Sequence, residues 1–339
     1  MKTAPINNGV EVTDIDLHDD EECRELGRLV AHECVVLVRQ GVSEKRLHEI
    51  QMLWGQPASG HIDRLVASRQ LTGRHWREMY LTLNNLVREI DGDVPRQGIT
   101  RVSFKKDRKN RVTGLFPNGE LDWHADHQSH EDAQRVIGLM SLWGSRGSKT
   151  GFLCTAPALD ALNSEDRSMV DELVSVWKWD GGQMCKGLEP ASMQITRFAM
   201  VPVDGMETRL LDSTATGRLG IHFPSHCFSH FKGMSAQESA KFKAHLWSRM
   251  DRPEHIYMHD WNDGEIVFMD QSITLHARPT DVVESDSRTM ARMISYMDRL
   301  FPGHGPRDTF SHNGQPIDLP QLAALADAQR KQQFELGEV

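Results

Sequence analysis

The sequence lacks three features that would place the protein in an oxidising compartment or a membrane. Its five cysteines include no Cys-x-x-Cys pair, so neither a disulfide framework nor a zinc knuckle is predicted, and we expect all five to be reduced. No stretch approaches eighteen apolar residues, and the amino terminus lacks the apolar core of a signal peptide. We therefore expect a cytoplasmic protein that makes no membrane contact.

The sequence also lacks the marks of nucleic-acid and nucleotide binding. The formal net charge is -9, and phosphate backbones are bound by clustered lysine and arginine. One basic run, residues 105–111, is interrupted by an acid and is better explained as a solvated loop or hairpin. The chain contains no P-loop and no strand-linked Gly-x-Gly-x-x-Gly sequence, and it has no Gly-x-Ser-x-Gly elbow of a serine hydrolase.

A chain of 339 residues could hold one large domain or two, and the hydrophobic pattern fits one mainly β domain over residues 1–339. A hydrophobic content of 39% is ordinary for a soluble globular protein with a sizeable core. Ser43 is expected to cap a helix that ends at Gly55, Ser235 to open another with a capping box, and Ser164 to precede a third that extends to Val176. Short strand-like runs lie between them at residues 35–38, 136–142, 199–203, 266–269 and 291–296. Scattered strands, long loops and a few helices fit a jelly-roll barrel.

A histidine–aspartate pattern is the first candidate for chemistry. His124 and Asp126 are two residues apart, so on a strand both side chains would point to one face. A third ligand must come from another strand, and His276 follows the predicted strand 265–270 beyond a turn. Two histidines and one carboxylate on one face of a metal leave its other face open. Non-haem Fe(II) oxygenases use this arrangement.

The segment around His276 resembles the taurine dioxygenase-like (TauD/TfdA) family of Fe(II)/2-oxoglutarate enzymes. The resemblance extends unevenly over residues 28 to 300. It implies a mainly β chain with α decoration, folded as a double-stranded β-helix (jelly-roll, cupin-like) barrel. It also implies a dioxygenase that uses Fe(II), 2-oxoglutarate and O2. The shared features are a tryptophan, a Gly-Glu pair, an apolar strand that ends in aspartate, and a Leu-His-Ala-Arg sequence (Trp261, Gly264, Glu265, Asp270 and residues 275–278).

The same resemblance implies which residues hold 2-oxoglutarate. Arg288 and Arg292 stand where the family places its two carboxylate-binding arginines. Arg292 matches the one that binds the distal carboxylate, and Arg288 is expected to steady the C1 end. Thr150 matches a threonine whose hydroxyl also contacts 2-oxoglutarate. A planar guanidinium fits a carboxylate through two parallel hydrogen bonds, which lysine cannot reproduce.

Several other histidines could suggest a different metal site. His127 and His130 continue the spacing from His124, and on a helix they would suggest zinc. They are explained more simply as the loop after the metal strand. The pairs His222/His226 and His255/His259 have no implied third ligand, so we do not expect them to bind the functional metal. His222 lies in a region where family members contact substrate or cofactor.

The expected reaction is hydroxylation of an unactivated C–H bond in a small amino-acid-like or amine-bearing metabolite, with release of succinate and CO2. Desaturation or oxidative cyclisation by the same iron centre stays open. A zinc-dependent hydrolase with the same ligands and a metal-activated water is the alternative from another class. Residues 57–114 match nothing and are expected to form a substrate-side insertion or lid. Residues 319–338 are expected to form a helix that packs on the barrel or contacts a second subunit of a homo-oligomer.

Overall fold

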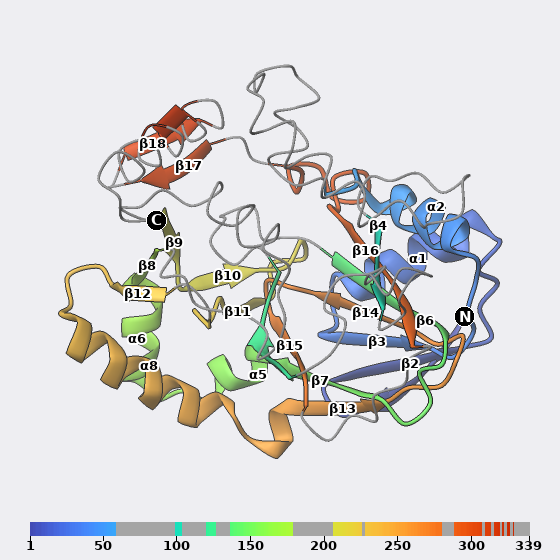
Figure 1. Ribbon diagram of the computed structural model, residues 1–339, viewed down its shortest axis with the longest axis horizontal. Coiled ribbons are helices and arrows are strands. Elements are labelled where there is room, and N and C mark those ends of the chain that lie inside the picture. The colour runs from blue at the N-terminus through green and yellow to red at the C-terminus, as the bar shows by residue number, and fades with distance from the viewer. Residues whose placement is uncertain are drawn as a thin grey trace, which may run out of the picture.

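The protein is built mainly from β-strands, with helices on the outside (Figure 1). The computed structural model describes residues 1–58, 99–103, 120–126, 136–178, 206–225, 228–279, 288–306, 309–312 and 315–318, with isolated positions beyond. The predicted class, mainly β with α decoration, is confirmed. Nearly all of the expected lid at 57–114 and of the expected helix at 319–338 lies outside the described residues, as does the expected strand at 199–203.

The larger inner sheet has seven strands in the order β1-β2-β3-β14-β6-β16-β4, and only β2 and β3 run parallel. Every position of β3 and β14 is buried, as in strands covered on both faces. The expected runs at 35–38, 136–142, 266–269 and 291–296 all fall on strands of this sheet. Its strands are β1 (Lys2–Ile6), β2 (Gly9–Thr13), β3 (Val35–Val38), β4 (Ile99–Ser103), β6 (Val136–Trp143), β14 (Ile266–Asp270) and β16 (Thr289–Ser295).

Two helices, α1 (Asp20–Val30) and α2 (Glu44–Trp54), cover the outer face of this sheet. The Ser43 hydroxyl accepts the backbone N–H of Arg46 and caps α2, which ends before Gly55 as the sequence predicts. Their apolar sides pack on the sheet, with the ring of Trp54 edge-on to that of Phe268 at 5.0 Å. The helices therefore close one side of the core.

A four-stranded sheet, in the order β13-β7-β15-β5, packs on the other face. Its strands are β5 (Leu121–His124), β7 (Lys149–Cys154), β13 (Ile256–Asp260) and β15 (Thr274–Arg278). His276 lies past the end of β14 and beyond a turn, as expected, and it belongs to a strand of its own, because residues 274–278 pair with both β7 and β5. Cys34 and Cys154 form a disulfide between the two sheets. The expectation that all five cysteines are reduced is wrong for this pair, which the fold brings together across 120 residues of sequence.

The outer face of the four-stranded sheet is covered by helices α5 (Thr155–Asp160), α6 (Ser164–Glu172) and α8 (Ala236–Met250), followed by a 3₁₀ turn at Pro253–His255. The capping box of Ser235 and Glu238 opens α8 as predicted. The helix near Ser164 is capped by Asn163 and ends at Glu172, so Val176 lies on a strand and not on this helix. The remaining strands are β8 (Val174–Trp177), β9 (Met206–Arg209), β10 (Leu211–Ser213), β11 (Leu219–Ile221), β12 (Phe228–Phe231), β17 (Thr309–His312) and β18 (Gln315–Asp318).

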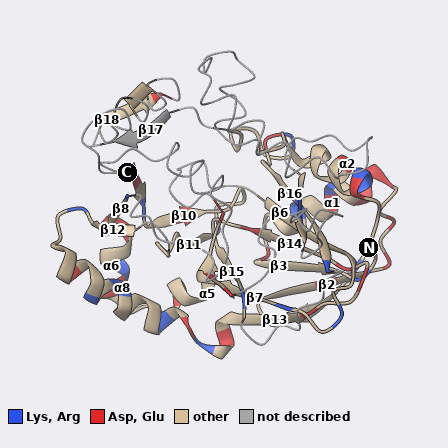
Figure 2. Cartoon of the chain, viewed as in Figure 1, with Lys and Arg blue, Asp and Glu red and all other residues tan. Residues whose placement is uncertain are grey.

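Acidic and basic side chains are mixed on the outer helices. Figure 2 shows both charges along α8 and in the layer formed by α1 and α2. Pairs such as Arg28 with Glu25, one turn apart on α1, are exposed. Within the described part of the chain, no helix combines the length and the apolar character needed to cross a membrane.

Candidate metal centre

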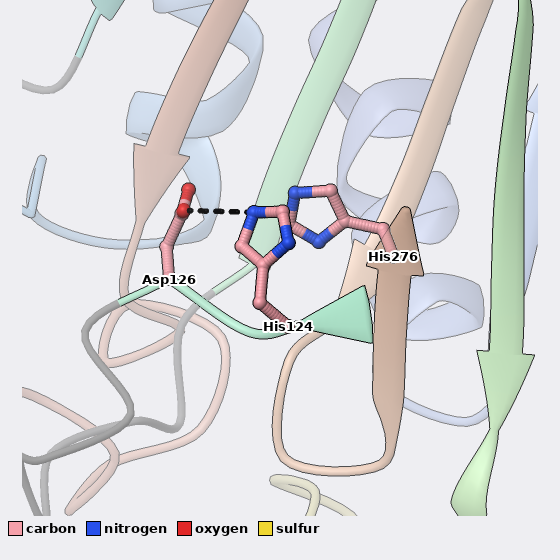
Figure 3. Close-up of side chains that lie close together, drawn as sticks. All are labelled: His124, Asp126 and His276. Carbon is pink, nitrogen blue, oxygen red and sulfur yellow. Dashed lines mark ion pairs between the residues drawn. The ribbon is translucent and has the colours of Figure 1, made fainter. Parts of the chain in front are cut away.

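Three predicted residues meet at the edge of the four-stranded sheet. His124 is the last residue of β5 and pairs directly with His276 on β15, with the two rings 4.1 Å apart. Asp126 lies two residues past β5 and turns back toward the histidines (Figure 3). One ligand atom from each side chain lies within 4.8 Å of the others, and among the described residues this is the one such group. The two side chains thus point to one place, as the spacing predicts, although Asp126 lies past the end of the strand and not on it.

His124 is buried and His276 is partly buried, and both are in the neutral form that binds metal. His124 Nδ1 lies 2.7 Å from the carbonyl oxygen of Asp122, so it donates its proton there and Nε2 faces Asp126, 3.8 Å away. Burial, reinforced by the neighbouring His276, lowers the pKa of His124 to about 3. Burial also lowers the pKa of His276. Metal ligation requires neutral imidazole, and both side chains are neutral at physiological pH.

Asp126 is held from two sides. Its backbone N–H donates to the side-chain oxygen of Gln271, which lies in the turn between β14 and β15. Its carboxylate accepts a hydrogen bond from Arg292 Nη1 at 2.7 Å. Arg292 projects from β16, so this ion pair joins the larger sheet to the candidate metal ligands. Sequence reasoning missed Gln271, and it gave Arg292 a different partner.

A second cluster of polar groups lies beside the histidines. Arg278 follows His276 by two positions on β15 and shares its face. The register of β15 with β7 runs to the pair Ala277–Gly151, so Arg278 and Thr150 are the next positions along the two strands. Arg288, near the start of β16, is buried. Its burial and the nearby charge of Arg278 lower the pKa of Arg288 to about 9. Arg278 belongs to the Leu-His-Ala-Arg sequence, and the alternation of side chains along a strand was the signal that could have placed it on the same face as His276.

These donors fit a divalent transition metal. Two neutral imidazoles and one carboxylate gather on one side of a common point, which is the donor set of non-haem iron sites and of open zinc sites. The buried arginines and the Thr150 hydroxyl nearby are hydrogen-bond donors that suit carboxylate oxygens. The arrangement can therefore hold a metal together with an anionic ligand.

The other candidate histidines lie apart from this group. His259 is 3.1 Å from Glu265, and His255 Nδ1 is 3.1 Å from the carbonyl of Met250. The His222 ring packs beside Trp177. His127, His130, His226 and the basic run at 105–111 lie outside the described residues.

Comparison with known families gives one match that covers most of the chain. Residues 2–294 match the family described as "Taurine catabolism dioxygenase TauD, TfdA family". A relative from Cupriavidus pinatubonensis, named alpha-ketoglutarate-dependent 2,4-dichlorophenoxyacetate dioxygenase, is 26% identical over 271 residues, 78% of this chain and 86% of the relative. Pentalenolactone F synthase from Streptomyces avermitilis is 22% identical over 209 residues, 55% of this chain and 68% of that protein.

Solved structures share the fold at lower sequence identity. A taurine dioxygenase from Burkholderia xenovorans superposes with a TM-score of 0.60 at 18% identity, covering 96% of this chain and 98% of that one. AAD-2 in complex with Mn(II) and N-oxalylglycine also superposes with a TM-score of 0.60, at 17% identity, covering 87% of this chain and 97% of that one. The predicted jelly-roll class is confirmed by these matches.

Proposed function

Because the chain belongs to the taurine catabolism dioxygenase TauD, TfdA family, we propose that it is an Fe(II)- and 2-oxoglutarate-dependent oxygenase. The observation that carries the proposal is the group of His124, Asp126 and His276, whose ligand atoms lie within 4.8 Å of one another. These three side chains would hold the iron. When bound, iron and 2-oxoglutarate supply the oxidising chemistry with O2 and release succinate and CO2.

Thr150, Arg278 and Arg288 would bind the far carboxylate of 2-oxoglutarate. Two buried guanidinium groups repel each other, and a carboxylate between them would relieve this repulsion. Thr150 is the next residue of β7 beyond the pair Ala277–Gly151, as Arg278 is of β15, and it offers a hydroxyl. This proposal changes the role expected for Arg292, whose guanidinium touches a metal ligand and so lies at the metal end of the site. The far carboxylate of a metal-bound 2-oxoglutarate is at the opposite end of a five-carbon chain.

Arg292 would then face the substrate or the metal-bound end of 2-oxoglutarate. A guanidinium next to the metal ligands favours a substrate that carries a carboxylate. An amino-acid-like metabolite meets this condition and agrees with the expectation from the sequence. Two relatives bear the names of dioxygenases for the carboxylates 2,4-dichlorophenoxyacetate and (S)-phenoxypropionate. We propose hydroxylation of a C–H bond in such a compound, with desaturation or oxidative cyclisation as the alternative outcome.

The arginine cluster separates this proposal from a zinc hydrolase. A zinc hydrolase that activates a water needs the three metal ligands. It does not need buried hydrogen-bond donors that bind a dicarboxylate co-substrate. Burial of Arg278 and Arg288, whose charges interact, therefore favours the oxygenase. Residues 1–339 would form one catalytic domain that acts in the cytoplasm on a small molecule, alone or as a homo-oligomer.

The test is succinate formation from 2-oxoglutarate under air, with Fe(II) and a panel of small carboxylates and amino acids. Anaerobic addition of Fe(II) and 2-oxoglutarate should also produce a weak visible charge-transfer band. His276→Ala serves as the control that removes a proposed ligand. Protein that contains iron and yet shows no band contradicts the proposal, and turnover with zinc in place of iron would favour the hydrolase.

A further inference from the structure

Thr150 is held by a tryptophan from the segment after β13. Trp261 Nε1 donates a hydrogen bond to Thr150 Oγ1 at 2.8 Å, and both side chains are buried. A threonine hydroxyl has one proton and two lone pairs, whereas an indole N–H only donates. Among the hydrogen bonds of the described residues, this hydroxyl accepts from Trp261 and donates none. The bond therefore does not use the hydroxyl proton, which Thr150 can donate to another acceptor.

A buried polar network keeps the indole in place. The ring of His259 stands edge-on to that of Trp261, with centroids 4.4 Å apart and an interplanar angle of 89°. His259 Nε2 lies 3.1 Å from the Glu265 carboxylate. That carboxylate accepts the backbone N–H of Asn262 at 2.9 Å and Arg39 Nη1 at 2.7 Å. A chain of contacts thus runs from a half-exposed arginine on the surface to the indole inside.

The strand register directs this network to one point of the site. His259 on β13 pairs with Thr150 on β7, and Trp261 follows directly after β13. The backbone N–H of Trp261 donates to the carbonyl of Ser148, two residues before Thr150. Both the main chain and the side chain of Trp261 are therefore fixed against the strand that carries the threonine.

We propose that Trp261 is a positioning residue for the co-substrate. It fixes the rotamer and the proton direction of the Thr150 hydroxyl, so that this hydroxyl donates to the far carboxylate of 2-oxoglutarate. The network of His259, Glu265 and Arg39 holds the indole for this purpose. The inference rests on the proposed function, since Thr150 has this ligand only if the chain binds 2-oxoglutarate.

The experiment is a double-mutant cycle on 2-oxoglutarate affinity. The dissociation constant is measured anaerobically with Fe(II) for the parent, Trp261→Phe, Thr150→Val and the double variant. Trp261→Phe should raise it about threefold to tenfold, the range spanned by one net hydrogen bond. The same change should have almost no effect when combined with Thr150→Val, because the hydroxyl through which it acts is gone. The KM for the organic substrate should stay near the parent value.

The control is Trp54→Phe. Trp54 is equally buried and donates its Nε1–H to the carbonyl of Cys23 at 2.7 Å, but it lies between α1 and α2. Trp54→Phe loses one buried indole hydrogen bond, as Trp261→Phe does. Because that bond joins α2 to α1 and does not involve Thr150, this variant should bind 2-oxoglutarate like the parent.

The outcomes separate the inference from the proposed function. If the parent loaded with Fe(II) does not bind 2-oxoglutarate, the proposed function fails, and the inference fails with it. If the parent binds and Trp261→Phe binds equally well, only the inference is overturned. Equal losses with and without Thr150→Val also overturn it, because the indole would then act by another route.

A second variant covers the case in which Trp261→Phe does not fold. Glu265→Gln keeps the side-chain volume and weakens the contacts with Arg39 and His259. Glu265→Gln should also raise the dissociation constant of 2-oxoglutarate, by less than Trp261→Phe does. This increase should disappear when Glu265→Gln is combined with Thr150→Val. An unchanged dissociation constant in folded Glu265→Gln would overturn the role of the network.

Discussion

Asp270, at the end of β14, is a buried acid whose charge depends on ordinary changes of pH. Burial raises the pKa of Asp270 to about 7, Ser272 opposes this shift through hydrogen bonds to the carboxylate, and Asp212 adds to it. The unfolded chain has the usual pKa of about 3.9. Between these two values the folded state binds more protons than the unfolded state, so this group stabilises the fold at low pH. The stabilisation is lost as the pH rises through about 7.

Asp270→Asn should therefore remove a pH dependence of stability. The amide oxygen can still accept from Ser272, but it does not ionise. From pH 5 to pH 7 the parent should lose the stability that the protonated Asp270 gives, and the variant should not. The free energy of unfolding of the variant minus that of the parent should therefore increase over this range, by at most about 1.4 kcal/mol per pH unit. Denaturant unfolding at both pH values measures this difference. Asp260→Asn, at an exposed position, controls for the loss of a charge. A constant difference between Asp270→Asn and the parent would contradict the assignment.

Arg288, just before β16, and Arg292, on β16, should have separate roles. Arg288→Ala should weaken 2-oxoglutarate binding about tenfold to a hundredfold, the value of a charge-assisted contact of roughly 1.5–3 kcal/mol. Arg292→Ala should change 2-oxoglutarate affinity much less and raise the KM for a carboxylate substrate, because Arg292 lies against Asp126. Anaerobic titration and steady-state kinetics distinguish the two. The reverse pattern would restore the role that the sequence alone gives to Arg292.

At the residue level, the sequence predicts what a single strand dictates. The spacing of His124 and Asp126 predicts that both can reach one ion, although Asp126 lies past the end of β5 and turns back toward it, and the family resemblance selects His276. The contact between Arg292 and Asp126 depends on how two sheets face each other. The contact between Gln271 and Asp126 likewise depends on the fold, because it brings the turn between β14 and β15 next to the end of β5. No spacing in the sequence encodes either distance.

Among the elements, those with local end signals were predictable and those defined by their partners were not. Ser43 with Gly55, and Ser235 with Glu238, mark the ends of α2 and the start of α8. The strand at Val174–Trp177 continues the apolar spacing of the preceding helix, so periodicity alone could not separate the two. Pairing with β9 and β12 decides its structure. The same holds for β15, which lies between β7 and β5.

The disulfide between Cys34, which directly precedes β3, and Cys154 on β7 gives a prediction at the scale of the elements. The Cα atoms of Cys34 and Cys154 are 5.8 Å apart, within the usual range of disulfides, and both residues are fully buried. Peptide mapping without reductant should recover a cross-linked pair containing both cysteines. Because the bond closes a loop of 120 residues, reduction should lower stability by up to about 4–5 kcal/mol.

The comparison of stability with and without reductant needs a matched variant, because a reductant can also change the protein at sites other than this disulfide. Cys34→Ala should unfold at the same temperature with and without reductant, whereas Cys23→Ala, which removes a buried free thiol, should keep the response of the parent. Recovery of only reduced peptides from protein alkylated before lysis would contradict the bond in the cell. That result would instead support the reduced state expected for a cytoplasmic protein.

At the scale of the whole molecule, the site joins the two inner sheets. The candidate metal ligands lie on or just after strands β5 and β15 of the four-stranded sheet, whereas Arg292 lies on β16 of the seven-stranded sheet and Arg288 directly precedes that strand. A metal would be held mainly by one sheet. A dicarboxylate bound to that metal and to Arg288 would connect both sheets, so we expect it to stabilise the assembly of the core as a unit.

Ligand binding should therefore stabilise the protein in two distinguishable steps. Mn(II) is a redox-inert substitute for iron, and N-oxalylglycine, present with Mn(II) in the AAD-2 structure, replaces 2-oxoglutarate. A ligand at a hundred times its dissociation constant adds about 2.7 kcal/mol, so each addition should raise the melting temperature. Hydrogen exchange should slow in β5 and β15 with metal alone, and in β16 only after N-oxalylglycine is added. Arg288→Ala should keep the first step and lose the second. Protection of β16 by metal alone would mean that Arg292, through Asp126, already connects the sheets, and that the dicarboxylate is not needed to join them.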